Sequence, residues 1–119
     1  MTGHRDIDEL ELLTAAYRDF NARRIDAVLA RMQPDVDWPN GMEGGRVHGH
    51  EEVRAYWTRQ WTLLDPHVDP VDMHIQPDRR VRVQVHQVVH DLAGNLLADS
   101  AVHHVYSFRD GLIERMEIE

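Results

Sequence analysis

Residues 81–118, VRVQVHQVVHDLAGNLLADSAVHHVYSFRDGLIERMEI, decide the fold of this chain. Apolar and polar residues alternate along three segments of this stretch, and residues 91–95 and 109–111 form short turns between them. Neighbouring strands that are joined by such turns pair antiparallel. Together with the alternating segment Val71–Ile75 before it, this half of the chain predicts a β-meander.

Helical spacing dominates the earlier half of the chain. A first helix is predicted by apolar residues that recur at steps of three and four, namely Ile7, Leu10, Leu13, Tyr17 and Phe20. A short second helix, ended by Pro34, is predicted by Ile25, Leu29 and Met32. A third helix from near His50 to Pro66 is predicted by the stripe Val53, Trp57, Trp61 and Leu64. Residues 35–38 alternate like a short strand, and residues 39–45 form a glycine-rich loop.

One domain accounts for this pattern. A chain of 119 residues has room for a single core, so we expect one domain over residues 1–119. Helices followed by a meander indicate an α+β fold, with a curved antiparallel sheet wrapped around three N-terminal helices in the shape of a cone. The hollow at the open end of such a cone is a common place for a small organic ligand.

Charge and composition argue against several classes of partner. The net charge is −8, from 21 acidic against 13 basic residues, and a surface of that sign repels nucleic acid and anionic lipid. Cysteine is absent, so neither a disulfide nor a thiolate nucleophile is available. The sequence contains no apolar run of roughly 20 residues and no apolar signal-peptide core. We expect a cytoplasmic protein that binds neither nucleic acid nor membrane.

Several short motifs occur in an order typical of one superfamily. They are Asn21-Ala22 before Ile25-Asp26-Ala27, the Asp35–Trp38 strand, Val47-His48-Gly49-His50-Glu51-Glu52-Val53, and the turn Phe108-Arg109-Asp110-Gly111-Leu112-Ile113. Over nearly the whole chain this order resembles the nuclear-transport-factor-2-like superfamily, in its SnoaL-like and ketosteroid-isomerase-like branch. The resemblance implies a cystatin-like α+β barrel, a homodimer, and a pocket between the first helices and the sheet. Members include isomerases, polyketide cyclases and dehydratases, so the fold alone does not define a reaction.

The isomerase branch implies three chemical groups that this chain does not reproduce. Its base carboxylate aligns with Trp38, in the step Trp38-Pro39, and an indole does not accept a proton. Its protonated carboxylic acid aligns near His104, and its tyrosine aligns with Ala16, one residue before Tyr17. We therefore reject steroid isomerisation by that mechanism.

Three residues are candidates for catalysis: Tyr17, His104 and Glu43. Tyr17 lies on the inward stripe of the first helix. Its hydroxyl could bind a carbonyl or enolate oxygen, or the residue could be an ordinary aromatic of the core. His104 shares an inward strand face with Tyr106. It could act on a ligand as an acid, a base or a hydrogen-bond donor, or it could be a core histidine whose hydrogen bonds are satisfied within the protein. Glu43 is the only carboxylate of the glycine-rich loop. It could have a gating or acid–base role, or it could be a solvated acid without a role in the site.

A second set of residues is predicted to contact the ligand: Trp38, Asn40, Met42, Trp57, Trp61, His86 and Tyr106. The three tryptophans wall a flat apolar ligand or pack in the core. Asn40 and Met42 lie on the loop that borders the mouth of the pocket. One of His86 and Gln87 faces inward, and the sequence does not distinguish between them.

Pairs of histidines raise the question of a metal ion. His48 and His50 lie near a helix start, while His103 and His104 are strand neighbours whose side chains point to opposite faces. No spacing brings together the three or four ligands that zinc normally takes. We expect no metal and no other cofactor.

Three functions fit these observations. The first is a cofactor-independent enzyme that isomerises, cyclises or dehydrates a small carbonyl-containing or polyketide-like substrate by acid–base chemistry. The second is a non-catalytic binding or carrier dimer with an aromatic pocket, and the third is a structural dimer whose pocket is filled by side chains. Trp38 at the base position favours binding, and an inward His104 favours chemistry. For the dimer, we expect an interface on the outward strand face that carries Ala101 and Val105.

Overall fold

The computed structural model describes the backbone of residues 3–119 and the side chains of residues 7–119. The helices are α1 (Gly3–Asn21), α2 (Ile25–Leu29) and α3 (Gly49–Trp61). The strands are β1 (Met32–Pro39), β2 (Arg46–His48), β3 (Leu64–Ile75), β4 (Val81–Asp91), β5 (Leu96–Arg109) and β6 (Leu112–Ile118). The predicted α+β class is therefore confirmed.

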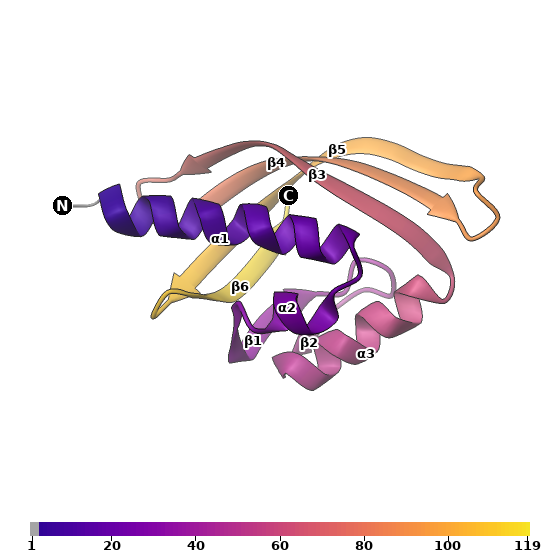
Figure 1. Ribbon diagram of the computed structural model, residues 1–119, viewed down its shortest axis with the longest axis horizontal. Helices are drawn as coiled ribbons and strands as arrows, with labels where there is room; N and C mark the ends of the chain where they lie inside the picture. The colour runs from indigo at the N-terminus through magenta and orange to yellow at the C-terminus, as the bar shows by residue number, and fades with distance from the viewer. Residues whose placement is uncertain (1–2) are drawn as a thin grey trace.

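The strands form one curved sheet in the order β2-β1-β6-β5-β4-β3. Strands β3 to β6 pair antiparallel in chain order, which confirms the predicted meander. Strand β1 adds to β6 in parallel, with Met32 opposite Ile113 and Asp37 opposite Arg115, a pairing that the sequence pattern does not predict. In Figure 1 the strands β3, β4 and β5 arch over α1, while α2 and α3 lie below it. The helices thus lie on the concave side of the sheet.

The predicted end of the second helix is wrong. Helix α2 ends at Leu29, and Met32 begins strand β1 instead of extending the helix. The N–H of Ile113 in β6 donates to the carbonyl of Arg31, so the chain is drawn into the sheet before Pro34 is reached. Long-range pairing, which helical spacing does not encode, overrides the local pattern here.

The predicted end of the third helix is also wrong. Helix α3 ends at Trp61, and Leu64 and Pro66 belong to strand β3. Strand β3 lies at the edge of the sheet, where it pairs only with β4. An edge strand tolerates a proline because one of its sides needs no N–H donors.

Two apolar residues of the periodic segments are exposed. Ile7, near the start of α1, is 56% exposed. Val71 is 62% exposed and is the unpaired residue where the register of β3 shifts between Pro70 and Asp72. A bulge adds one residue and moves the following side chains to the other face, so Met73 packs against the core.

The expected dimer interface at Val105 needs correction. Val105 is only 2% exposed, so it is not available as an outward contact. Arg82 of β4 and Glu117 of β6 stand opposite it on the two neighbouring strands. Long charged side chains cover apolar neighbours with their methylene groups, which explains the burial of a valine on the outer face.

The core lies between the helices and the inner face of the sheet. Leu13 of α1, Val53 and Trp57 of α3 and Val83 of β4 belong to one buried cluster. Val81, Val83 and Val85 are all fully buried, as the alternation along β4 predicts. This packing does not fill the whole concave side, and the space that it leaves is the candidate site.

Candidate functional site

A cavity of about 380 Å³ lies between the helices and the sheet. Its lining comes from α1, α2, α3, the loop after β1, and every strand except β2. Among the described residues, none of the lining side chains is Asp, Glu, Lys or Arg. The volume falls within the range of small-molecule sites, so the tryptophans do not fill the space as a purely structural dimer would require.

Three polar side chains form a hydrogen-bonded chain in the wall of this cavity. The hydroxyl of Tyr106 donates to the hydroxyl of Tyr17 at 2.8 Å. The Tyr17 hydroxyl in turn lies 2.7 Å from Nδ1 of His104. Helix α1 supplies Tyr17 and strand β5 supplies the other two, which are two residues apart and therefore share a face.

Burial controls the ionisation of these three groups. Burial, with a smaller contribution from the charge of His103, lowers the pKa of His104 to about 4. Burial and the neighbouring Tyr106 raise the pKa of Tyr17 well above its ordinary value. Burial also raises the pKa of Tyr106, although its hydrogen bond to Tyr17 opposes this effect. All three groups are therefore neutral at pH 7.

Histidine 104 keeps one ring nitrogen available. Its Nδ1 is occupied by Tyr17, whereas Nε2 has no hydrogen-bond partner among residues 7–119. The imidazole itself lines the cavity. A neutral imidazole offers one donor and one acceptor, so Nε2 presents either a proton or a lone pair according to the tautomer.

Aromatic rings form the wall beside this polar chain. Trp38 packs edge-on against Trp57 with ring centroids 5.7 Å apart, and it lies 6.1 Å from Tyr106. All three rings line the cavity. Trp61 stacks on Trp57 at 6.0 Å but is not part of the lining, and Arg23 lies over its ring. Trp61 thus supports the wall from behind.

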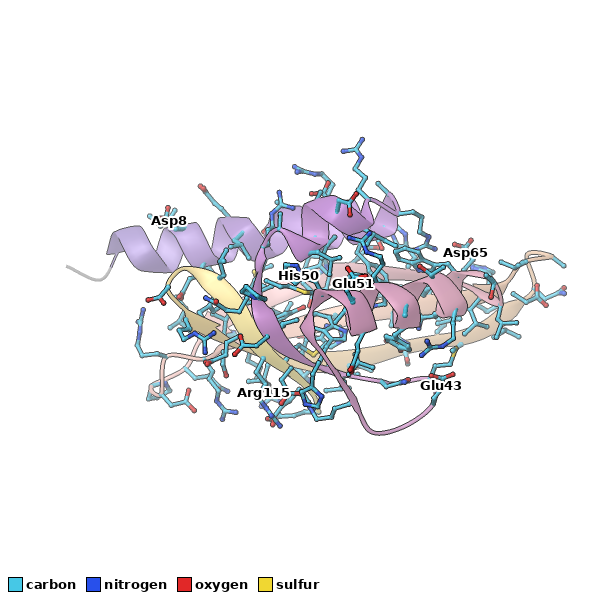
Figure 2. The ribbon with its side chains drawn as sticks, turned by 90° about the horizontal axis from the view of Figure 1, so that it is seen from below. Asp8, Glu43, His50, Glu51, Asp65 and Arg115 are labelled. Atoms are coloured by element: carbon cyan, nitrogen blue, oxygen red, sulfur yellow. The ribbon has the colours of Figure 1, made fainter. Side chains whose placement is uncertain are left out.

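The glycine-rich loop contributes Met42 and Gly41 to the lining, but not Asn40 or Glu43. Asn40 donates to the Glu43 carboxylate at 2.9 Å and accepts from the Glu43 N–H at 2.8 Å. Arg59 of α3 also donates to Glu43, at 3.0 Å. These hydrogen bonds hold the pKa of Glu43 below its usual value. Figure 2 shows Glu43 at the outer edge of the molecule, so this pair fixes the loop and lies outside the cavity.

The open choice between His86 and Gln87 is resolved by the structure. Gln87 lines the cavity, whereas His86 lies on the outer face, where its Nε2 is 2.7 Å from Asp99. The alternation that buries Val83 and Val85 continues along β4 and carries Gln87 to the same face. His86 is therefore placed outside the site for which it was a candidate.

Two lining residues with polar side chains were missed in the sequence. Tyr56 and Gln60 of α3 both line the cavity, and the Gln60 amide donates to the Tyr56 hydroxyl at 3.3 Å. Burial raises the pKa of Tyr56. The signal was their spacing of four residues, which places both on one side of the helix next to Trp57.

The acidic strand residues Asp35 and Asp37 lie elsewhere. Asp35 pairs with Arg109 at 2.8 Å, and Asp37 is held by Arg46 and Arg115, all outside the cavity lining. Within the described residues, no group of three or more His, Cys, Asp or Glu side chains converges on a possible metal position. None of the helices in residues 3–119 is long and apolar enough to cross a membrane.

Solved structures share this architecture. TerC, co-crystallised with polyporic acid, is 32% identical; the match covers 94% of this chain and 90% of TerC, with a TM-score of 0.82. An NTF2-like protein of unknown function from Burkholderia pseudomallei is 28% identical, over 94% of this chain and 89% of that chain, with a TM-score of 0.82. A Mycobacterium tuberculosis protein in complex with estradiol-17β-hemisuccinate is 18% identical over 92% and 90%, with a TM-score of 0.78, and shows the shared fold alone.

Sequence comparison places the chain in a family. A search of curated proteins finds no match. The family model of the SnoaL-like domain matches residues 13–116, which include the cavity-lining residues from Ala16 to Met116. This match spans most of the 119 residues and agrees with the fold. The chain therefore belongs to the SnoaL-like domain family of the nuclear-transport-factor-2-like superfamily.

Proposed function

We propose that this chain binds a small organic molecule through a carbonyl or enol oxygen and moves a proton on it with His104 and Tyr17. The hydrogen-bonded chain from Tyr106 through Tyr17 to His104, in the wall of an uncharged aromatic cavity, carries this proposal. The reaction class is an isomerisation, cyclisation or dehydration of a carbonyl-containing or polyketide-like substrate. The side chains of the protein supply the proton transfer.

The two tautomers of His104 give the site two chemical states. In one, Tyr17 donates to Nδ1 and the imidazole presents an N–H at Nε2, which binds a carbonyl oxygen. In the other, Nδ1 donates to the Tyr17 oxygen and Nε2 presents a lone pair. Tyr17 then accepts from both Tyr106 and His104, and its own proton is free for the ligand.

The second state carries the proposed chemistry. Nε2 of His104 removes a proton from the carbon next to the carbonyl, while the Tyr17 hydroxyl donates to the oxygen on which the negative charge forms. The proton then returns from Nε2 to another atom of the same enolate, which completes an isomerisation without any other reactant. The Tyr106 hydroxyl stabilises the charge that Tyr17 shares with the enolate.

Hydrogen–deuterium exchange tests this proposal directly. The probe is 2-tetralone, a two-ring ketone with acidic hydrogens next to its carbonyl, followed by NMR in D₂O with the purified protein. We expect catalysed exchange that falls by about 100-fold or more in His104→Gln and in Tyr17→Phe. His86→Gln, which changes an exposed histidine outside the cavity, is the matched control and keeps the wild-type rate.

The pH dependence separates His104 from surface histidines. Because the pKa of His104 is about 4, exchange should rise as the pH increases through about 4 and be flat near neutral pH. An exchange rate that is equal in wild type and His104→Gln contradicts the catalytic role.

A carrier function is the second candidate, favoured by the indole of Trp38 and by the lack of any carboxylate among the described lining residues. A carrier binds ligand at Tyr17 and His104 but does not exchange its hydrogens. The 32% identity to TerC makes polyporic acid the second ligand to titrate. Binding without exchange of 2-tetralone supports the carrier.

We also propose a homodimer, as the family resemblance implies, with an interface that does not use Val105. Leu92, Leu96 and Leu97 are each more than half exposed at the turn between β4 and β5, and Leu63 precedes the β3 residue that pairs with Asp91. Figure 1 shows this hairpin extending beyond the helices. An exposed apolar group of this kind is typical of an interaction surface.

Light scattering tests this dimer. Leu96→Glu should give the monomer mass, whereas Ile7→Glu, at another exposed apolar position on α1, should leave the dimer unchanged. A wild-type protein that is already monomeric contradicts the dimer.

A further inference from the structure

We propose that the cavity selects an elongated, uncharged molecule with hydrogen-bonding groups at both ends, and that Gln87 binds the end away from His104. This inference rests on the proposed function, because it requires that one end of the ligand lies at Tyr17 and His104. Beyond the proposed function, it specifies the length and charge of the ligand and assigns Gln87 as a residue that determines specificity.

The absence of charged side chains in the lining supports the claim that the ligand is uncharged. Charged residues make up 29% of the chain, yet among the described residues none of them lines the cavity. Burial keeps the His104 imidazole neutral, since its pKa is about 4. A carboxylate or ammonium group would lose its hydration here without gaining a partner of opposite charge, which costs several kcal/mol. An uncharged ligand avoids this penalty.

The register of the sheet gives the length. His104 of β5 stands opposite Val83 of β4, and Gln87 lies four residues further along β4. At about 3.3 Å per residue, the two polar side chains are separated by roughly 13 Å along the strand direction. Val102 lines the cavity between them, opposite Val85. The floor is therefore polar, then apolar, then polar, which matches a molecule of two or three rings.

Gln87 has its full hydrogen-bonding capacity available. Its side chain has no hydrogen-bond partner among residues 7–119, although it lines the cavity. By contrast, the Gln60 amide already donates to Tyr56. An amide offers two donors and an acceptor oxygen, so Gln87 can bind either a hydroxyl or a carbonyl group.

Isothermal titration calorimetry with three rigid probes tests the inference. The probes are biphenyl-4-ol, biphenyl-4,4′-diol and biphenyl-4,4′-dicarboxylate, titrated into the wild type and two variants. Gln87→Leu removes the proposed contact, and Gln84→Leu makes the same change three residues earlier on the exposed side of β4. The wild type should bind the diol about threefold to tenfold more tightly than the mono-ol, as one added neutral hydrogen bond predicts.

The variants decide the assignment. The preference for the diol should disappear in Gln87→Leu and persist in Gln84→Leu, and the dicarboxylate should bind at least about 100-fold more weakly than the diol. If the mono-ol binds but the diol gains nothing, or if the gain survives in Gln87→Leu, the inference is overturned while the proposed function stands. If the dicarboxylate binds as well as the diol, the inference that the ligand is uncharged is overturned. If neither phenol binds and 2-tetralone exchange is also absent, both proposals fall.

Discussion

The two faces of the same strands have opposite chemistry. On the inner face, Val81, Val83 and Val85 are fully buried, and His104 is hydrogen-bonded to Tyr17 of helix α1. The outer face of the sheet carries ion pairs instead. Examples are Asp37 between Arg46 and Arg115, Arg82 with Glu119 at 3.1 Å, and Arg115 with Glu117 at 2.9 Å. Figure 2 shows Arg115 at the outer side of the sheet.

This difference separates two uses of polar side chains. Outer ion pairs remain partly hydrated, so each one contributes little and can be replaced. Polar groups on the inner face have lost water, and they stay neutral and hydrogen-bonded to avoid a large penalty. Gln87 is half-buried, and neither its amide nor Nε2 of His104 has a hydrogen-bond partner among residues 7–119, so these are the polar groups that remain available to a ligand.

The largest expected effect comes from a charge on the inner face. Val83→Asp places a carboxylate where the side chain is fully buried, and we expect a loss of at least about 4 kcal/mol in the free energy of unfolding or a failure to fold. Gln84→Asp, at the next and exposed position, should change it by no more than about 0.5 kcal/mol. Urea unfolding measures both. Equal unfolding midpoints for the two variants contradict the assignment of the faces.

The titration of His104 should give an intermediate effect. Its pKa is about 4 in the folded protein against about 6.5 in the unfolded chain, so the unfolded state binds more protons between these values. Its contribution to stability is therefore complete above pH 6.5 and is lost as the pH falls to about 4, by up to about 3 kcal/mol.

Two measurements check this titration. The unfolding free energy of the wild type should fall more steeply between pH 6.5 and 4 than that of His104→Gln, while His86→Gln should keep the wild-type slope. An NMR titration of the His104 ring should show a midpoint near 4. A midpoint near 6.5 would mean that the ring is hydrated, and it would remove the contrast between the faces.

The smallest expected effect comes from the outer face. Burial tends to raise the pKa of Asp37, but the hydrogen bond from Arg46 and the charges of Arg46 and Arg115 outweigh it and keep the pKa low. Asp37→Ala should lower the free energy of unfolding by roughly 1–2 kcal/mol, because two arginines lose their partner. Asp35→Ala, two residues earlier and much more exposed, should cost less than about 0.5 kcal/mol. Thermal unfolding compares the two, and equal losses would show that Asp37 is as hydrated as Asp35.

The candidate site was predicted unevenly from the sequence. Tyr17, Trp38 and His104 were placed on inward faces by periodicity, and all three line the cavity. Glu43 was chosen for its place in a loop, and the structure puts it in a pair with Arg59 outside the cavity. A loop has no repeat that fixes the direction of its side chains, so its residues are the least predictable.

The sequence by itself determined the period of each element, the meander, and the inward direction of Val81, Val83 and Val85, because helices and strands repeat at fixed intervals along the chain. Only the tertiary structure decided that β1 pairs with β6 in parallel and that a bulge exposes Val71. It also decided that the hydroxyl of Tyr17 meets the imidazole of His104, 87 residues away in the chain. Such contacts depend on the register and curvature of the whole sheet, which no local pattern encodes.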